Sequence, residues 1–248
     1  MKGIRFIVFL FVFSSAFTVI HAQSYLEFVE NKGQWDKQVS FRGLMVSGAF
    51  ILKPDGGYRM VLHDHNDLSA LSHYYHGESN NGGASTGLTT ASHSITDNKT
   101  ITLHSHAYEV KFLNANPNPV IIPDKPLNTY NNYYIGDDPS KWSSGCKIYT
   151  AVTYKNVYPN IDVRYYTSKG QLKYDIIVNP GGDTKNIALY FDGVDALKLR
   201  DGVLSVKTSV DEVKELPPYS YVQAEEGRQE MTSAYELKGN ILRFNIGS

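Results

Sequence analysis

Two short segments of the sequence each carry a His-x-His pair, VLHDHND at residues 61–67 and LHSHAYEV at residues 103–110. On a β-strand, residues two apart lie on the same face, so each pair could present two imidazoles to a zinc or copper ion. A joint site would require the two strands to be neighbours with both pairs on one face. The candidate metal ligands are His63, His65, His104 and His106.

The sequence around these histidines offers little else that a metal or an active site needs. No acidic third ligand or general base stands at a diagnostic spacing, and no HExxH motif occurs. All seven histidines after residue 22 fall in or beside one polar stretch, where we interpret them as solvated strand ends. We therefore expect no resident metal, no cofactor and no catalytic residue.

The first residues have the pattern of a secretory signal peptide. Two basic residues precede an apolar run at residues 6–13, and small residues follow up to Ala22. The run is shorter than the roughly 20 residues that a membrane-spanning helix needs. We expect residues 1–22 to be removed and residues 23–248 to be secreted, without membrane insertion.

Charge and cysteine content narrow the class of protein further. Residues 1–22 hold two of the 24 basic residues and none of the 25 acidic ones, so the remainder carries a net charge of −3. This balance disfavours nucleic acid as a partner. The single cysteine, Cys146, cannot form an internal disulfide, and we interpret it as a small packing residue rather than a nucleophile. A chain of this length buries a core without such cross-links.

Strand signals dominate the rest of the chain, with short runs of β-branched and aromatic residues between turn residues. The segment GAFILKPDGGYRMVLHD predicts a hairpin around residues 54–57. No stretch of a dozen residues keeps a 3.6-residue apolar period, so we expect an all-β fold, an antiparallel β-sandwich of one or two packed sheets. Further strands are expected at 101–113, 129–135, 161–167, 171–178, 186–192, 196–200, 203–208, 219–225, 231–238 and 240–246.

One stretch, residues 66–100, departs from this pattern. It is rich in Ser, Thr, Asn, Gly and His and poor in apolar residues, so it cannot bury enough surface to offset the entropy of ordering it. We interpret it as a flexible, disordered insertion between two strands of a single β-rich domain, residues 23–248.

Tyrosine is the other excess, with 18 residues that include three adjacent pairs. Exposed tyrosines on a secreted β-sandwich can form a platform for sugar rings, which makes a glycan-binding module one alternative. Tyrosine also suits a half-buried strand, and adjacent strand residues point to opposite faces, so no pair forms a platform by itself. We favour the packing role for most of them.

A hydrolase is the second alternative, and its best carboxylate pair is Asp162 and Asp175 in IDVRYYTSKGQLKYDIIV. A four-residue loop would set these two carboxylates opposite each other, which is repulsive. A two-residue loop, Lys169-Gly170, places Arg164 opposite Asp175 instead, and the glycine suits a type I′ turn. We predict the second register, in which the pair is not assembled and Asp175 is a poor general acid beside its arginine.

Several motifs together resemble a known family. They are FVENKGQWDKQVSFRG, HAYEVKFLNANPNP, NTYNNYYIGDDPSKW, VTYKNVYPNIDVRYYTSKGQLKYDIIVNPGGD and LPPYSYVQ. From about Phe28 to the last residue, the chain resembles the N-terminal domain of unknown function in large secreted bacterial proteins. Those proteins continue into SBBP β-propeller repeats or adhesin-like domains and end in a gliding-motility-associated C-terminal domain. The resemblance implies export, through the type nine secretion route, and no established activity.

These observations favour a noncatalytic extracellular module of a larger secreted or cell-surface bacterial protein. The sequence ends at RFNIGS without propeller repeats or a sorting domain, so we expect the chain to be the front part of a longer protein. The expected partners are those downstream domains, together with surface glycans or proteins. A carbohydrate-active hydrolase and a glycan-binding module remain the alternatives.

Overall fold

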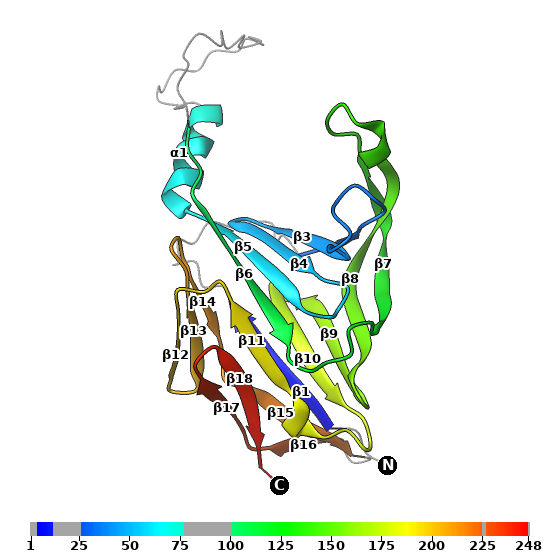
Figure 1. Ribbon diagram of the computed structural model, residues 1–248, viewed down its shortest axis with the longest axis vertical. Helices are drawn as coiled ribbons and strands as arrows, with labels where there is room; N and C mark the ends of the chain where they lie inside the picture. The colour runs from blue at the N-terminus through cyan, green and yellow to red at the C-terminus, as the bar shows by residue number, and fades with distance from the viewer. Residues whose placement is uncertain (1–3, 12–25, 77–100, 225–226, 248) are drawn as a thin grey trace, which may run out of the picture.

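The computed structural model describes residues 4–11, 26–76, 101–224 and 227–247, and of residues 4–11, 75 and 76 only the backbone. It is an all-β fold with a single longer helix (Figure 1). The strands are β1 (Ile4–Phe11), β2 (Phe28–Glu30), β3 (Phe41–Met45), β4 (Gly48–Leu52), β5 (Tyr58–His63), β6 (Ser105–Phe112), β7 (Val120–Tyr133), β8 (Ser143–Tyr158), β9 (Ile161–Ser168), β10 (Gln171–Val178), β11 (Ala188–Asp192), β12 (Ala196–Arg200), β13 (Val203–Lys207), β14 (Glu212–Glu215), β15 (Tyr219–Ala224), β16 (Gly227–Met231), β17 (Ser233–Lys238) and β18 (Ile241–Ile246). The helices are α1 (His65–His76) and two single 3₁₀ turns, η1 (Pro139–Lys141) and η2 (Thr184–Asn186).

The long strand β8 divides the sheet into two layers. One edge of β8 pairs with β7. Its other edge pairs with two strands, with β2 at residues 148–149 of β8 and with β9 at residues 151–158 of β8. From β9 the first layer continues through β10, β1, β15 and β16. From β2 the second layer continues through β3, β4, β5, β6, β11, β18 and β17. Every pairing is antiparallel, which confirms the predicted antiparallel sandwich.

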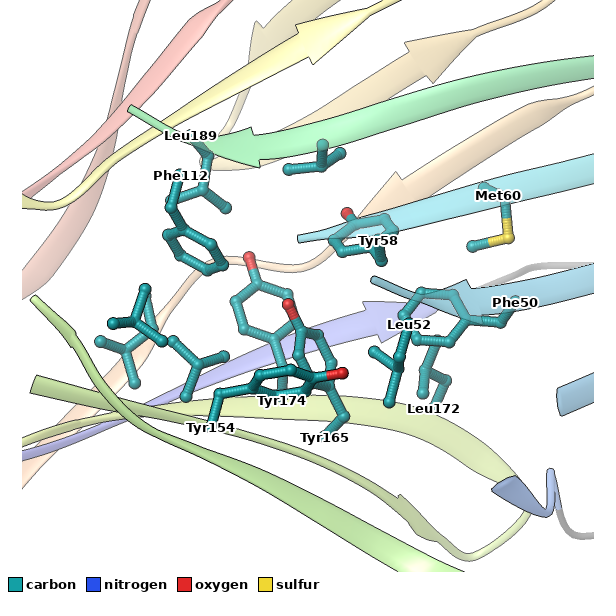
Figure 2. Close-up of a cluster of buried hydrophobic side chains, with 14 of the residues drawn as sticks. Phe50, Leu52, Tyr58, Met60, Phe112, Tyr154, Tyr165, Leu172, Tyr174 and Leu189 are labelled. Carbon is teal, nitrogen blue, oxygen red and sulfur yellow. The ribbon is translucent and has the colours of Figure 1, made fainter. Parts of the chain in front are cut away.

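The core lies between these two layers and is dominated by aromatic side chains (Figure 2). Phe50 and Tyr58 come from the second layer and meet Tyr165 of the first, with ring centroids 5.8 and 6.1 Å from that of Tyr165. Alternate residues of β10 are buried, as a half-buried strand requires. Burial of this alternating apolar face is the main stabilising term of the fold.

The two hairpins predicted from turn residues are present. Strands β4 and β5 pair with Leu52 opposite Tyr58, around the predicted loop. Strands β9 and β10 pair with Asp175 opposite Arg164, the register of the two-residue loop. Lys169 and Gly170 have φ angles of 51° and 73°, and positive φ at both loop residues is what a type I′ turn requires.

The helix α1 corrects the sequence interpretation, which expected no helix and an insertion beginning at residue 66. Asp64 caps the helix, because its Oδ1 accepts hydrogen bonds from the backbone N–H groups of Asn66, at 2.9 Å, and Asp67, at 3.1 Å. The helix surface is polar and mostly exposed, so an apolar period could not reveal it. The remaining part of the expected insertion, residues 77–100, lies outside the described residues.

The sequence analysis also missed several strands. Strand β8 was absent from the expected list although it spans 16 residues, and only the end of β7 was included. Residues 4–11, expected to belong to a cleaved signal peptide, form β1 between β10 and β15 in the full chain. No helix within the described ranges is long and apolar enough to cross a membrane.

Candidate ligand-binding site

The four candidate histidines lie at one end of the second layer, where β5 and β6 are neighbours, but they do not share a face. His63 pairs with Ser105, and His106 pairs with the core residue Leu62. Since cross-strand partners lie on the same face, His63 and His106 point to opposite sides. His65 has left the strand and begins α1.

Each remaining imidazole has a local hydrogen-bond partner. His63 Nδ1 is 2.7 Å from Ser105 Oγ, and His104 Nδ1 is 2.7 Å from Asp67 Oδ2. His106 Nε2 donates to the carbonyl oxygen of Gly193 at 2.6 Å, so its Nδ1 is the acceptor toward Ser209. In the parts of the chain that the structure describes, no three His, Cys, Asp or Glu side chains gather as a metal site.

The candidate carboxylate pair of a hydrolase is likewise separated. Asp162 stands opposite Ile177, two positions from Asp175. The Asp162 carboxylate is buried and accepts hydrogen bonds from Lys155 Nζ at 2.6 Å and from the Asn156 backbone at 2.8 Å. Asp162 therefore fastens the end of β8 to β9.

A different carboxyl group, that of Glu215 on β14, is wholly buried. Its oxygens accept hydrogen bonds from Tyr58 at 3.4 Å and Tyr174 at 3.2 Å, with no cation bound to it among the described residues. Burial raises the pKa of Glu215 to about 7, although the two tyrosine hydrogen bonds act to lower it. Enclosed by the core, this acid has no route to a ligand and acts on stability.

A more accessible site is built by the loop between β2 and β3, and the side chain of Asn31 shapes that loop. Its Nδ2 donates to the carbonyl oxygens of Asp36 at 2.9 Å and Val39 at 2.8 Å, and its Oδ1 accepts from the Trp35 backbone N–H at 3.2 Å. One amide thus replaces several backbone partners that the loop lacks. Lys32 ties the loop to the start of β8 through the carbonyl of Ser144 at 2.9 Å.

The loop places Trp35 over a pocket of about 330 Å³, which we call the Trp35 pocket. This volume lies near the lower end of the range of roughly 300–1,000 Å³ for small-molecule sites. Its wall combines an aromatic pair, aliphatic residues and a few polar groups. The lining residues are Glu27, Val29, Trp35, Arg42, Leu44, Asn131 and Tyr133.

The aromatic part of the wall is an edge-to-face pair. The rings of Trp35 and Tyr133 have centroids 5.1 Å apart at an interplanar angle of 67°. The Arg42 guanidinium carbon lies 5.8 Å from the Trp35 ring centroid, within the range of a cation–π contact. Val29 packs beneath them with Cys146 and Ile148 in a small second core.

The pocket also holds polar groups suited to a hydroxylated ligand. Asn131 Nδ2 donates to the Tyr133 hydroxyl at 3.3 Å, and the Glu27 side chain is partly exposed in the same lining. Arg42 Nε is buried and has no hydrogen-bond partner among the described residues. A buried donor without a partner costs roughly 1–3 kcal/mol.

Irregularities in β7 position two of the lining residues, Asn131 and Tyr133. The register between β7 and β8 shifts between Pro126 and Tyr130 and again between Asn131 and Tyr133. Such bulges re-aim side chains beside functional sites. Here Tyr133 enters the pocket, whereas Tyr130 on the same strand is 62% exposed.

Beyond the pocket, the far halves of β7 and β8 project from the sheets as an arm (Figure 1). Its tip carries exposed large side chains, among them Tyr134 and Trp142, whose rings pack edge to face at 5.9 Å. Trp142 Nε1 donates to the carbonyl oxygen of Gly136 at 3.1 Å. We call the residues Tyr130, Tyr134, Ile135 and Trp142 the aromatic arm.

On the other side of Trp35 lies a second, more open hollow of about 540 Å³. Its lining includes Lys37, Ile121 and Pro123, so the Trp35 side chain forms a ridge between two concave surfaces. A ridge with hollows on both sides extends the surface over which a chain-like ligand could lie.

Sequence patterns did not predict this site. The tyrosine pair on β9 divides between faces as expected, since Tyr165 is buried in the core and Tyr166 is only partly buried, whereas the pair at residues 74 and 75 lies on α1 and not on a strand. The available signal was Trp35 in ENKGQW, a tryptophan in a loop of turn-forming and polar residues. Its partner Tyr133 comes from a distant part of the chain, and Arg42, in the next strand β3, is brought beside it by the fold of the loop, so spacing could not reveal them.

Comparison with known families matches residues 28–248 to the family "Domain of unknown function (DUF7948)". The match covers most of the chain, which therefore belongs to this family. Neither a curated protein nor a solved structure matches the chain.

Proposed function

We propose that this DUF7948 chain is a noncatalytic extracellular module of a larger secreted or cell-surface bacterial protein, and that it binds a carbohydrate at the Trp35 pocket. Export follows from the N-terminal signal-peptide pattern. The larger setting, adhesin-like and associated with gliding motility and type nine secretion, follows from the motif resemblance.

The observation that supports binding is the Trp35 pocket itself. An aromatic face beside a few convergent polar groups is the arrangement that orients a sugar, because the ring packs on the apolar C–H face while hydroxyls reach Arg42, Asn131 and Glu27.

The same lining favours binding over hydrolysis. Glycosidases of the common types use two carboxyl groups roughly 5 to 10 Å apart across the scissile bond. Among the lining residues described here, Glu27 is the single carboxylate, and Asp162 and Asp175 lie elsewhere. The alternative of a carbohydrate-active hydrolase therefore has less support.

Intrinsic fluorescence offers a direct test, because the chain contains two tryptophans, Trp35 and Trp142. The Trp142→Phe variant isolates the signal of Trp35, and titration with cello-, manno- and N-acetylglucosamine hexasaccharides should shift it for at least one sugar. The Trp35→Phe variant isolates Trp142 and should show a smaller shift.

A matched pair of variants then assigns the site. Arg42→Gln should weaken the binding of that sugar at least about tenfold, since a hydrogen bond to a charged group contributes roughly 1.5–3 kcal/mol. Lys198→Gln, on β12 and outside the lining of both hollows, should leave it unchanged. Release of reducing ends from any of the sugars would contradict the noncatalytic assignment, and equal effects of the two variants would place the site elsewhere.

A further inference from the structure

Strand β1 fills a gap in the first layer that no other described strand fills. Six consecutive residues, 4–9, pair with β10, and four of them, residues 4–7, also pair with β15. Residues 10 and 11 pair with Glu215 and Lys214 of β14. Both neighbours run antiparallel to β1, so β10 and β15 are parallel to each other across it.

The two strands that flank β1 depend on it for their second partner. Among the described residues, β10 otherwise pairs with β9 alone and β15 with β16 alone. With β1 removed, two facing rows of backbone N–H and C=O groups would open in the middle of a sheet, separated by twice the strand spacing, about 9.5 Å. Such edges pair readily with an added strand. We call this gap the β10–β15 slot.

The family match places the slot inside the domain and its occupant outside it. Strands β10 and β15 both lie within residues 28–248, which the family spans, whereas β1 lies before them. The proposed cleavage after Ala22 would also take residues 4–11 away. Every other described strand of the domain is already paired elsewhere in the sheets.

We propose that the processed domain accepts, in the β10–β15 slot, an extended apolar β-strand donated by a partner polypeptide. This inference rests on the removal of the leader, which is part of the proposed function. The added strand would run antiparallel to both neighbours, as β1 does, and complete the sheet by main-chain hydrogen bonds.

The slot defines the chemistry of that strand. Tyr174, Ile176 and Val178 of β10 are buried in the core, and cross-strand partners share a face. A donor must therefore carry apolar residues at the alternate positions opposite them. In β1 these positions are Val8, Phe6 and Ile4, which pair with Tyr174, Ile176 and Val178 in that order. A strand of about eight residues spans the slot, which is the length of β1.

One buried polar group, the hydroxyl of Ser220, favours a strand other than residues 4–11 as the natural occupant of the slot. Ser220 of β15 is 1% exposed, and its Oγ has no partner among the described residues. Ser220 and Ile176 stand on either side of residue 6, where the sequence has Phe6. A donor with a hydroxyl group near this position would satisfy Ser220 and remove a cost of roughly 1–3 kcal/mol.

The experiment compares the protein before and after export. N-terminal sequencing of the exported protein comes first, and retention of residues 4–11 would overturn the proposal. The probe is a synthetic peptide with the sequence of residues 4–11, carrying lysines at both ends for solubility. The processed protein should bind it with one-to-one stoichiometry, and the unprocessed chain should not, because β1 already occupies the slot.

Two controls locate the bound peptide. A peptide with proline at positions 6 and 8 lacks two N–H donors and should bind at least about 100-fold more weakly. A peptide with cysteine at position 9 should form a disulfide with the Lys173→Cys variant, its register partner, and not with Lys198→Cys on β12. Cross-linking to both cysteines at the same rate would contradict the register.

Two other results would contradict the donation of a strand by a partner polypeptide. Full amide-exchange protection of β10 and β15 in the processed protein without peptide would show that the slot has closed. A stable dimer cross-linked through Lys173→Cys would assign the slot to a second copy of the chain. The Trp35→Ala variant separates this proposal from sugar binding, since it should lose the sugar and still bind the peptide.

Discussion

The interior and the surface of this protein use aromatic side chains in different ways. In the core, Tyr58, Tyr165 and Tyr174 are fully buried, and the Tyr58 and Tyr174 hydroxyls donate to the carboxylate of Glu215. At the Trp35 pocket and the aromatic arm, the rings are half-buried or exposed and surround open volume. The richness in tyrosine seen in the composition therefore comes from two sets with different roles.

The two regions differ in enclosure rather than in residue type, because the interior rings are sealed in the core and the surface rings border a pocket or solvent. In the interior, Tyr58 and Tyr174 donate to the buried acid Glu215, whereas the hydroxyls of Tyr108, Tyr154 and Tyr235 have no partner among the described residues. The surface set shares the wall of an open pocket with Arg42, Asn131 and Glu27, so its polar neighbours are accessible to a ligand. A change in the core should alter stability, and a change in the pocket should alter binding.

The largest effect is expected from a cavity in the aromatic core. Tyr165→Ala removes a buried ring that contacts Phe50 and Tyr58 and a hydroxyl that donates to the Gly56 carbonyl at 2.7 Å. Unfolding in urea should show a loss of about 4 kcal/mol. Tyr130→Ala, in the aromatic arm, is the control and should change stability by less than about 0.5 kcal/mol. Comparable losses would erase the distinction between the regions.

The second effect concerns the buried acid. Because the folded-state pKa of Glu215, about 7, is above its ordinary value of 4.5, its contribution is fully favourable below pH 4.5 and is lost as the pH rises through 7. Glu215→Gln should therefore be more stable than the native protein at pH 8, by about 3 kcal/mol, and similar to it at pH 4.5. Thermal unfolding across this range measures the difference. A parallel pH dependence in both proteins would exclude Glu215 as its source.

A paired carboxylate on the outer face should behave in the opposite sense. Burial acts to raise the pKa of Glu109, but hydrogen bonds from Lys53 and Arg59 lower it to about 2. Its contribution is therefore present above pH 4.5 and is lost as the pH falls toward 2. Glu109→Gln should cost about 2 kcal/mol at pH 7, since partial exposure weakens the pair, and less at pH 3. A cost that does not decline in acid would argue against the ion pairs.

The smallest effect is expected at the aromatic arm. Trp142→Ala removes the edge-to-face contact with Tyr134 and the hydrogen bond to Gly136. Global stability should fall by less than about 1 kcal/mol, because the ring is 43% exposed. Amide exchange should become faster at the arm tip and remain unchanged in β9 and β10. Faster exchange throughout the first layer would mean that the arm supports the sandwich.

Local sequence predicted those parts of the fold that local physics decides. Alternating apolar residues identified β9 and β10, and the charges of Arg164 and Asp175 together with Gly170 predicted their register correctly, although the guanidinium of Arg164 forms its ion pair with Asp124. The helix α1 was missed because its signal is the cap at Asp64 and not an apolar face. The long strand β8 was missed because its two halves serve different layers, so its burial does not follow one simple alternation.

By itself, the sequence determined the all-β class, the register of the β9–β10 hairpin and the division of Tyr165 and Tyr166 between faces, since each follows from neighbouring residues and a period of two. Only the tertiary structure decided which aromatic residues meet Glu215 and which surround a pocket. Sheet pairing and the bulges of β7 bring Tyr133 beside Trp35 and Arg42, which lie far from it in the chain. Strand pairing likewise decided on which face His63 and His106 lie, because a shift of one residue in the register moves a side chain to the other side of the sheet.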